Sequence, residues 1–222
     1  MTAYFVTATG TDVGKTFVTA GLITVLKTRG RTVSALKPLV SGYSDETKAE
    51  SDSGRLLTAL GEATTTENIA RISPWRFAVP LSPDMAAARE RRTIDLAALT
   101  AFSTRAVEEH TGTLFIEGVG GVMVPLTDTG TTLDWMAELN LPALLVTGSY
   151  LGSLSHTLTA LDALKHRGLK VAALVVNETE GSTVPLAETA ATLARYCKDP
   201  IAIIPRYAGA TPFGLLADML AL

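Results

Sequence analysis

The sequence predicts a doubly wound α/β fold with a mostly parallel sheet, in a single domain that spans residues 1–222. Two observations lead to this prediction: short apolar runs rich in β-branched residues alternate with longer amphipathic stretches, and the first run leads into a glycine-rich loop. Strands that are buried on both faces of a parallel sheet are apolar throughout, and their alternation with helices is typical of α/β proteins. A chain of 222 residues is short for two full domains.

The expected strands are the six apolar runs at 3–8, 32–37, 113–117, 143–148, 171–176 and 201–204. The stretches between them predict helices near 15–29, 52–60, 94–110, 131–139, 154–167 and 184–197. Gly30, Gly112 and Gly168 fall where three of these helices should end. The remainder of region 43–92 is more polar and less regular, so we expect this part of the chain to form an irregular connection that lies over the ends of the strands.

Composition excludes several classes of protein. Apolar residues make up 47% of the chain and charged residues 18%, which excludes intrinsic disorder. A net charge of −3 does not indicate the basic surface that binds nucleic acid. A single cysteine, Cys197, excludes a disulfide framework. The longest apolar runs are far shorter than the roughly 18 residues that a membrane helix needs. No basic segment precedes an apolar run at the start, so we expect a cytoplasmic protein that binds neither nucleic acid nor membranes.

The segment 8-ATGTDVGKTFVTAGL-22 predicts a phosphate-binding loop between a strand and a helix. In such a loop Lys15 would reach the β- and γ-phosphates and the Thr16 hydroxyl would bind Mg²⁺. The strict Walker A pattern has glycine where this chain has Thr9, and here the glycine stands at position 10. Partition and septum-site ATPases carry a second, signature lysine at that place, so Gly10 argues against their class. A chance Gly-Lys-Thr is the alternative, but the strand and helix context favours a P-loop NTPase-like domain.

Lys37 ends the second expected strand, in the segment 36-LKPLVSG-42. The carboxyl ends of parallel strands share one edge, so Lys37 should lie beside the phosphate loop. Pro38 should stop further strand pairing. A lysine at this place can hold a second anion, with Ser41 donating a hydrogen bond. The alternative is an ordinary exposed lysine.

Glu117 ends the third expected strand and precedes the glycine-rich loop 118–121. This is a Walker B-like position, where a carboxylate holds Mg²⁺. Asp52 begins a predicted helix and could complete an oxygen set of Thr16, Asp52 and Glu117 around the ion. The alternative for Asp52 is a helix N-cap, because 50-ESDSGRLL-57 is typical of a helix start.

Eight segments together resemble the dethiobiotin synthetase family, the ATP-dependent cyclo-ligases of biotin synthesis. They are 5-FVTATGTDVGKT-16, 36-LKPLVSG-42, 82-SP-83, 117-EGVGGVMVPL-126, 134-DW-135, 151-LGSLSH-156, 176-VN-177 and 204-IP-205. They occur in the family's order and extend over nearly the whole chain. The chain departs from the family at Ala8, where glycine is common, and at Asp12, where many members have glutamate.

The resemblance implies a reaction and its participants. With ATP and Mg²⁺, 7,8-diaminononanoate and CO₂ (or bicarbonate) would give dethiobiotin, ADP and phosphate through a carbamate and a carbamic-phosphoric anhydride. The protein would be a homodimer, with each substrate site completed by the neighbouring subunit.

The resemblance also implies residue roles. The nucleotide phosphates would lie against Thr11, Asp12, Val13, Gly14, Lys15, Thr16 and Phe17. Asn177 would recognise adenine, with Pro205, Arg206 and Tyr207 on the other side of the base. Catalysis would involve Lys15, Lys37, Ser41 and Thr11, and the diamine would lie along Gly118, Val119, Gly120 and Gly121. The substrate's distant carboxylate would bind the neighbouring subunit's Leu151, Gly152, Ser153, Leu154 and Ser155 at a helix N-terminus.

Three other functions share the phosphate loop. A regulatory ATPase or nucleotide switch would have no use for Lys37 or the loop 118–121. A glutamine-dependent amidotransferase needs a glutaminase domain with a cysteine nucleophile, for which the chain is too short. A nucleoside kinase is the third alternative. ATP hydrolysis that requires both the diamine and bicarbonate would separate the cyclo-ligase from all three.

Overall fold

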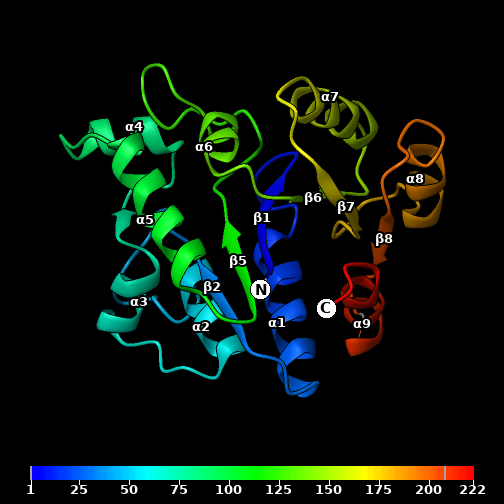
Figure 1. Ribbon diagram of the computed structural model, residues 1–222. Helices are drawn as coiled ribbons and strands as arrows, with labels where there is room; N and C mark the ends of the chain where they lie inside the picture. Colours follow the sequence, from blue (N-terminus) through cyan, green and yellow to red (C-terminus); the bar gives the residue numbers. More distant parts are fainter. Residues whose placement is uncertain (1, 208) are drawn as a thin grey trace.

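The computed structural model describes residues 2–207 and 209–222, and its centre is a six-stranded parallel sheet (Figure 1). The strand order is β2-β5-β1-β6-β7-β8. The strands are β1 (Thr2–Ala8), β2 (Val33–Leu36), β5 (Thr113–Glu117), β6 (Ala143–Gly148), β7 (Val171–Asn177) and β8 (Ile201–Ile204). Every pairing in the sheet is parallel. The predicted α/β class and all six predicted strands are confirmed.

Helices flank the sheet, as the alternating pattern predicts (Figure 1). Those foreseen are α1 (Lys15–Thr28), α2 (Asp52–Leu60), α5 (Leu96–Glu109), α6 (Thr132–Leu139), α7 (Ser153–His166) and α8 (Leu186–Leu193). Helix α1 packs against α2, α5 against α6, and α7 against α8. No helix in the described part of the chain is both long and apolar enough to span a bilayer.

The core lies on both faces of the central strands. Strands β5 and β6 are buried along their whole length, and β1 is buried beyond its first residue. Trp135 of α6 is fully buried and meets Phe5 of β1 edge-on, with ring centroids 4.8 Å apart. Burying a large apolar side chain contributes about 1.5–3 kcal/mol, so this packing holds the strand ends at fixed positions.

Region 43–92 is more regular than expected. It contains α3 (Thr66–Ile72), β4 (Trp75–Phe77) and α4 (Pro83–Arg89) in addition to α2. Strand β4 pairs in parallel with β3 (Leu39–Ser41), which forms a second, two-stranded sheet. The prediction that Pro38 stops further strand pairing is therefore wrong outside the main sheet. The Pro38 carbonyl accepts a hydrogen bond from the Trp75 N–H at 3.0 Å, and strand pairing resumes at β3. Strands of three residues are too short to show a sequence period.

Helix α9 (Ala210–Met219) was also not foreseen. It packs against α1, where the Phe213 ring occupies the space beside Gly21. A Cβ at Gly21 would lie 2.3 Å from that ring, so the contact depends on glycine. Phe213 also meets Phe17 edge-on, with ring centroids 5.4 Å apart.

The register of the sheet brings three predicted site elements to one edge. Val6 of β1 is level with Glu117 of β5, and Leu36 of β2 is level with Ile116. The phosphate loop after β1, Lys37 after β2 and Glu117 therefore lie at the same carboxyl edge, where ligands bind in open α/β sheets.

Candidate active site at the carboxyl edge of the sheet

A cavity of about 870 Å³ opens at this edge of the sheet. It lies between the phosphate loop, the connection from β2 to β3, the start of α2 and the glycine loop after β5. The predicted site residues that line it are Thr11, Asp12, Gly14, Lys15, Thr16, Phe17, Lys37, Ser41, Asp52, Val119 and Gly120. The structure thus places the predicted carbamate residues and most of the predicted phosphate residues around one space, with Thr16 and Asp52 of the predicted metal set. Glu117 and Val13 are buried and do not line the cavity.

The phosphate loop has the backbone that an anion cradle needs. Gly14 has a φ of 99° and Asp12 a φ of 56°, and the helix α1 begins at Lys15. Successive backbone turns of this kind direct N–H groups inward, and the helix N-terminus adds a partial positive charge. Gly14 also leaves room for a neighbour, since a Cβ there would lie 2.2 Å from Asn177 Nδ2.

Lys15 ties the phosphate loop to the glycine loop. Its Nζ donates to the Gly120 carbonyl at 2.8 Å and to the Gly10 carbonyl at 3.2 Å. Burial and then the charge of Lys37 lower the pKa of Lys15 to about 8, although nearby carboxylates oppose the shift. Lys15 can therefore lose its charge within the physiological range.

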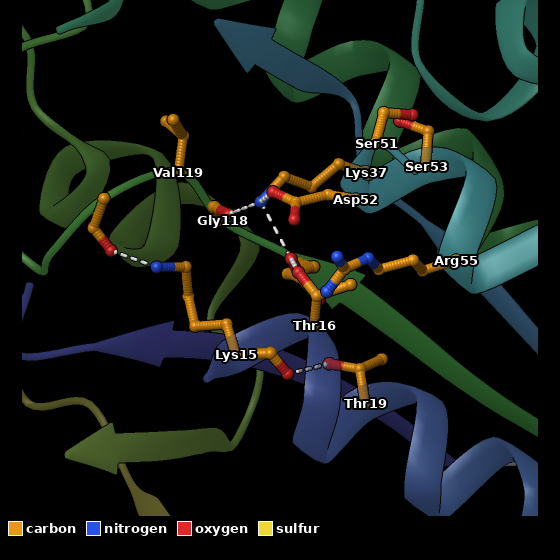
Figure 2. Close-up of polar contacts among 12 residues, drawn as sticks. Lys15, Thr16, Thr19, Lys37, Ser51, Asp52, Ser53, Arg55, Gly118 and Val119 are labelled. Carbon is orange, nitrogen blue, oxygen red and sulfur yellow. Dashed lines mark hydrogen bonds and ion pairs between the residues drawn. The ribbon is translucent and has the colours of Figure 1, made fainter. Parts of the chain in front are cut away.

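Lys37 is the centre of an ionic cluster that is buried at Lys37 and Glu117 and partly exposed at Asp52 (Figure 2). Its side chain is 2% exposed, and its Nζ contacts Glu117 Oε1 at 2.8 Å and Asp52 Oδ2 at 3.2 Å. A third bond goes to the Gly118 carbonyl at 2.7 Å. Burial disfavours the ammonium charge, but the two carboxylates outweigh it and raise the pKa of Lys37. The exposed-lysine alternative is wrong, because this lysine is buried, charged and fixed in place.

The donor set at Thr16, Asp52 and Glu117 fits a magnesium ion. Thr16 Oγ1 donates to Glu117 Oε1 at 2.6 Å. Glu117 Oε2 is buried and has no hydrogen-bond partner among residues 2–207 and 209–222. Hydroxyl and carboxylate oxygens are the ligands Mg²⁺ prefers, completed by phosphate and water. No three His, Cys, Asp or Glu side chains of the described chain form a metal site by themselves, so phosphate oxygens would have to complete this one.

Asp52 faces the cluster instead of capping its helix. The N-cap of α2 is Ser51, whose hydroxyl accepts the Gly54 N–H at 3.1 Å. The N-cap interpretation of Asp52 is therefore wrong. Burial opposes the carboxylate charge, but Lys37, the Thr16 hydroxyl and Lys15 together outweigh it and lower the pKa of Asp52. Asp52 is thus ionised at neutral pH, as a metal ligand must be.

Asn177 lies at the end of β7, against the phosphate loop. Its Nδ2 donates to the Val13 carbonyl at 3.0 Å. Its Oδ1 is buried and has no partner in the part of the chain that the structure describes. Asn177 therefore supports the loop with one end of its amide and keeps the other end available.

The segment Pro205, Arg206 and Tyr207 follows β8, the neighbour of β7. The Arg206 N–H donates to Glu178 Oε2 at 2.9 Å, and the Tyr207 side chain is 91% exposed. This segment adjoins the end of Asn177's strand but does not line the 870 Å³ cavity.

The segment 151–155 lies at the start of α7 and is also outside that cavity. Leu151 is 92% exposed and Ser155 is exposed, whereas the Ser153 side chain is fully buried. Within one chain, the fold does not bring this helix start to Lys37.

Gly118 and Gly121 of the predicted diamine loop contribute backbone atoms to the site. The Gly118 carbonyl accepts a hydrogen bond from Lys37, and Gly121 packs on the Thr9 backbone.

Arg55 is among the cavity residues that were not predicted from the sequence. Arg55 lines the cavity from α2, one helical turn after Asp52. Residues three apart share a face of a helix, so the spacing from Asp52 was a signal that could have indicated it.

The parallel sheet, the strand–loop–helix around Lys15 and the acid at the end of β5 define a P-loop nucleotide-binding protein of the α/β class. A family model described as an AAA domain matches residues 2–213. Among solved structures, the Pyrococcus furiosus cell division ATPase MinD aligns with a TM-score of 0.54 at 20% identity, covering 100% of this chain and 99% of that one. FtsY from Thermotoga maritima aligns with a TM-score of 0.55 at 13% identity, covering 99% and 68%. These identities show the fold alone.

Curated relatives go further than the fold. The ATP-dependent dethiobiotin synthetase of Methylobacterium nodulans is 45% identical over 97% of this chain and 98% of its own length. That of Caulobacter sp. strain K31 is 46% identical over 99% and 94%. The chain belongs to the family of ATP-dependent dethiobiotin synthetases.

Gly14→Ala is expected to weaken Mg-ATP binding at least about tenfold, because displacing Asn177 Nδ2 breaks its bond to Val13. Gly30→Ala is the matched control: its φ of 69° is also positive, but a Cβ there meets nothing within 4 Å. Both variants should lose about 1–2 kcal/mol of stability from backbone strain. Calorimetric titration with Mg-ATP and urea unfolding separate the two effects. Equal ATP affinities for the two variants would contradict the contact with Asn177.

Proposed function

We propose that the protein catalyses the dethiobiotin synthetase reaction, in which Mg-ATP drives ring closure of 7,8-diaminononanoate with CO₂. The observation that carries this proposal is the fixed, buried ammonium of Lys37 at the rim of the phosphate cavity. A nucleotide switch has no use for a second cation there, whereas a carbamate substrate needs one. Membership of the dethiobiotin synthetase family supports the same conclusion.

The proposed reaction has three steps. One amine of the substrate takes up CO₂, loses a proton and becomes a carbamate. A carbamate oxygen then attacks the γ-phosphorus of ATP, and ADP leaves, which gives a carbamic-phosphoric anhydride. The second amine attacks the carbonyl carbon, loses a proton and expels phosphate as the ureido ring closes.

The chain's residues stabilise and align these anions. Lys15 and the N–H groups of the phosphate loop would hold the β- and γ-phosphates, with Thr11 at the rim. Lys37 and Ser41 would hold the carbamate. Lys37 Nζ already contacts two carboxylates and a carbonyl, which fix the position of its charge. An ammonium has three N–H groups, so the carbamate would replace one of these contacts when it binds and would then be stabilised electrostatically. Positioning then replaces covalent catalysis.

Thr16, Asp52 and Glu117 would hold Mg²⁺, with the unpartnered Glu117 Oε2 as one ligand. When bound, the ion neutralises negative charge on the nucleotide phosphates. Thr16 and Lys37 orient the Glu117 carboxylate through its other oxygen.

The remaining contacts are assigned by the family resemblance. The loop Gly118–Gly121 would line the diamine, and Asn177 Oδ1 with the segment Pro205–Tyr207 would contact the adenine. The segment 151–155 would bind the substrate carboxylate of the partner subunit in a homodimer. The exposure of Leu151, Gly152 and Ser155 outside the chain's own cavity supports that role, whereas the Ser153 side chain is buried. A fully active monomer in sedimentation at assay concentration would exclude the cross-subunit site.

ATP binding should weaken as the pH rises above 8, because Lys15, with its pKa near 8, then loses its charge in the free protein. Bound phosphates would restore the charge, so binding should be accompanied by proton uptake and lose about tenfold in affinity per pH unit there. The pKa of Lys37 is raised, so that lysine stays charged over the same range. Calorimetry in two buffers of different ionisation enthalpy, at pH 7 and pH 9, measures both quantities. A pH-independent affinity without proton uptake would contradict this account.

Phosphate release from Mg-ATP, with and without the diamine and bicarbonate, tests the proposed function. We expect release only when both are present, with an equal amount of dethiobiotin. Release that is indifferent to the diamine would favour the regulatory ATPase or nucleotide switch and overturn the proposal.

A further inference from the structure

Arg55 places a guanidinium over the phosphate side of the cavity. It lies on α2, three residues after Asp52, and lines the cavity. Figure 2 shows the side chain extending from α2 with its guanidinium directed toward Thr16. Its Nε donates to the Glu50 carbonyl at 3.0 Å. This bond holds the side chain through its inner nitrogen, and because the residue is exposed its terminal nitrogens remain accessible to a ligand.

The charges around the cavity distinguish Arg55 from the two lysines. The charge of Lys37 is paired with two carboxylates, and Lys15 donates to two backbone carbonyls. Within residues 2–207 and 209–222, the Arg55 guanidinium forms no ion pair, and its terminal nitrogens have no acceptor. A guanidinium is always charged in proteins. Arg55 is therefore a permanent positive charge available to a ligand.

We propose that Arg55 binds the polyphosphate of the nucleotide through its terminal nitrogens. Thr16 stands at the start of α1, where phosphates bind, and the guanidinium is directed toward it. The planar fork of arginine matches two phosphate oxygens at once, which lysine cannot do. Arg55 lines the same cavity as the phosphate-loop residues Lys15 and Thr16, so polyphosphate is the anion that the position of Arg55 fits. This inference rests on the nucleotide binding of the proposed function and not on its diamine chemistry.

The test uses the full chain and three variants. Calorimetric titrations with Mg-ATP and with Mg-tripolyphosphate, which has no base or ribose, are compared for the parent, Arg55→Gln and Arg55→Lys. Arg105→Gln is the matched control, because Arg105 is an exposed arginine of α5 that does not line the cavity. Thermal unfolding of each variant verifies that it is folded.

We expect Arg55→Gln to reduce the affinity for both ligands about tenfold or more, which corresponds to one lost charge-assisted contact. Arg55→Lys should recover part of this loss, and Arg105→Gln should bind as the parent does. Parental affinity of Arg55→Gln for both ligands would overturn the proposal. A rise only in the KM for the diamine would also overturn it, because Arg55 would then bind the organic substrate.

The two proposals can fail separately. A parent protein that binds Mg-tripolyphosphate but forms no dethiobiotin would refute the cyclo-ligase and leave the Arg55 comparison intact. Normal dethiobiotin formation with unchanged affinities in Arg55→Gln would refute the role of Arg55 alone. A parent that binds neither polyphosphate ligand would refute both.

Discussion

Lys37→Ala is expected to reduce turnover about 10²–10³-fold, the usual cost of losing one preorganised donor to a developing anion. Mg-ATP affinity should stay close to that of the parent, because Lys15 and the phosphate loop, not Lys37, would bind the nucleotide. The buried ammonium contacts Glu117, Asp52 and the Gly118 carbonyl, and the substitution removes the charge together with all three contacts. Steady-state kinetics and calorimetric titration with Mg-ATP give the two quantities.

The same substitution removes one partner of a buried ion pair, which generally costs about 3–5 kcal/mol. The assays must therefore be made at a temperature and in a buffer in which circular dichroism shows that the Lys37→Ala variant is folded. Lys165→Ala is a control for loss of a lysine, since Lys165 is exposed on α7. If the folded Lys37→Ala variant turned over like the parent, or if it lost ATP binding, the assignment of Lys37 to the carbamate would be wrong.

Glu117→Gln should have the second largest effect, with activity reduced about 100-fold or more and the Mg²⁺ concentration for half-maximal activity raised about tenfold. The amide is similar in size, and its oxygen can still accept from Thr16 and Lys37. Its nitrogen would replace Oε2, the buried oxygen without a hydrogen-bond partner in the described chain. A donor at that position cannot bind a cation.

Magnesium titration of activity measures this effect, and a thermal shift with Mg-ATP provides a readout that does not depend on turnover. Glu108→Gln is a suitable control, because Glu108 is exposed on α5. An unchanged Mg²⁺ requirement in Glu117→Gln would exclude this carboxylate as a ligand.

Much of the site could be predicted because parallel strands end at one edge. The sequence places Lys37 and Glu117 directly after apolar runs, and the order of strands brings both beside the phosphate loop. That argument needs only the pattern of apolar runs and the rule that the carboxyl ends of parallel strands share one edge. The same reasoning predicted all six strands of the main sheet.

The details that depend on long-range packing could not be predicted. Asp52 has the sequence context of an N-cap, and only the structure shows that Ser51 caps the helix while Asp52 contacts Lys37. The burial of Lys37 could likewise not be predicted from the sequence, because a lysine after a strand is usually exposed. Strands β3 and β4 are too short to show a period.

Transfer of oxygen from CO₂ to phosphate tests the central claim most directly. In the proposed reaction the carbamate oxygen that attacks the γ-phosphorus leaves with phosphate when the ring closes. Freshly dissolved ¹⁸O-labelled CO₂, given to the protein with Mg-ATP and the diamine before exchange with water, should therefore yield phosphate carrying one ¹⁸O atom, measured by mass spectrometry. Unlabelled phosphate under those conditions would mean that water attacks ATP, and would contradict the carbamate mechanism and the role proposed for Lys37.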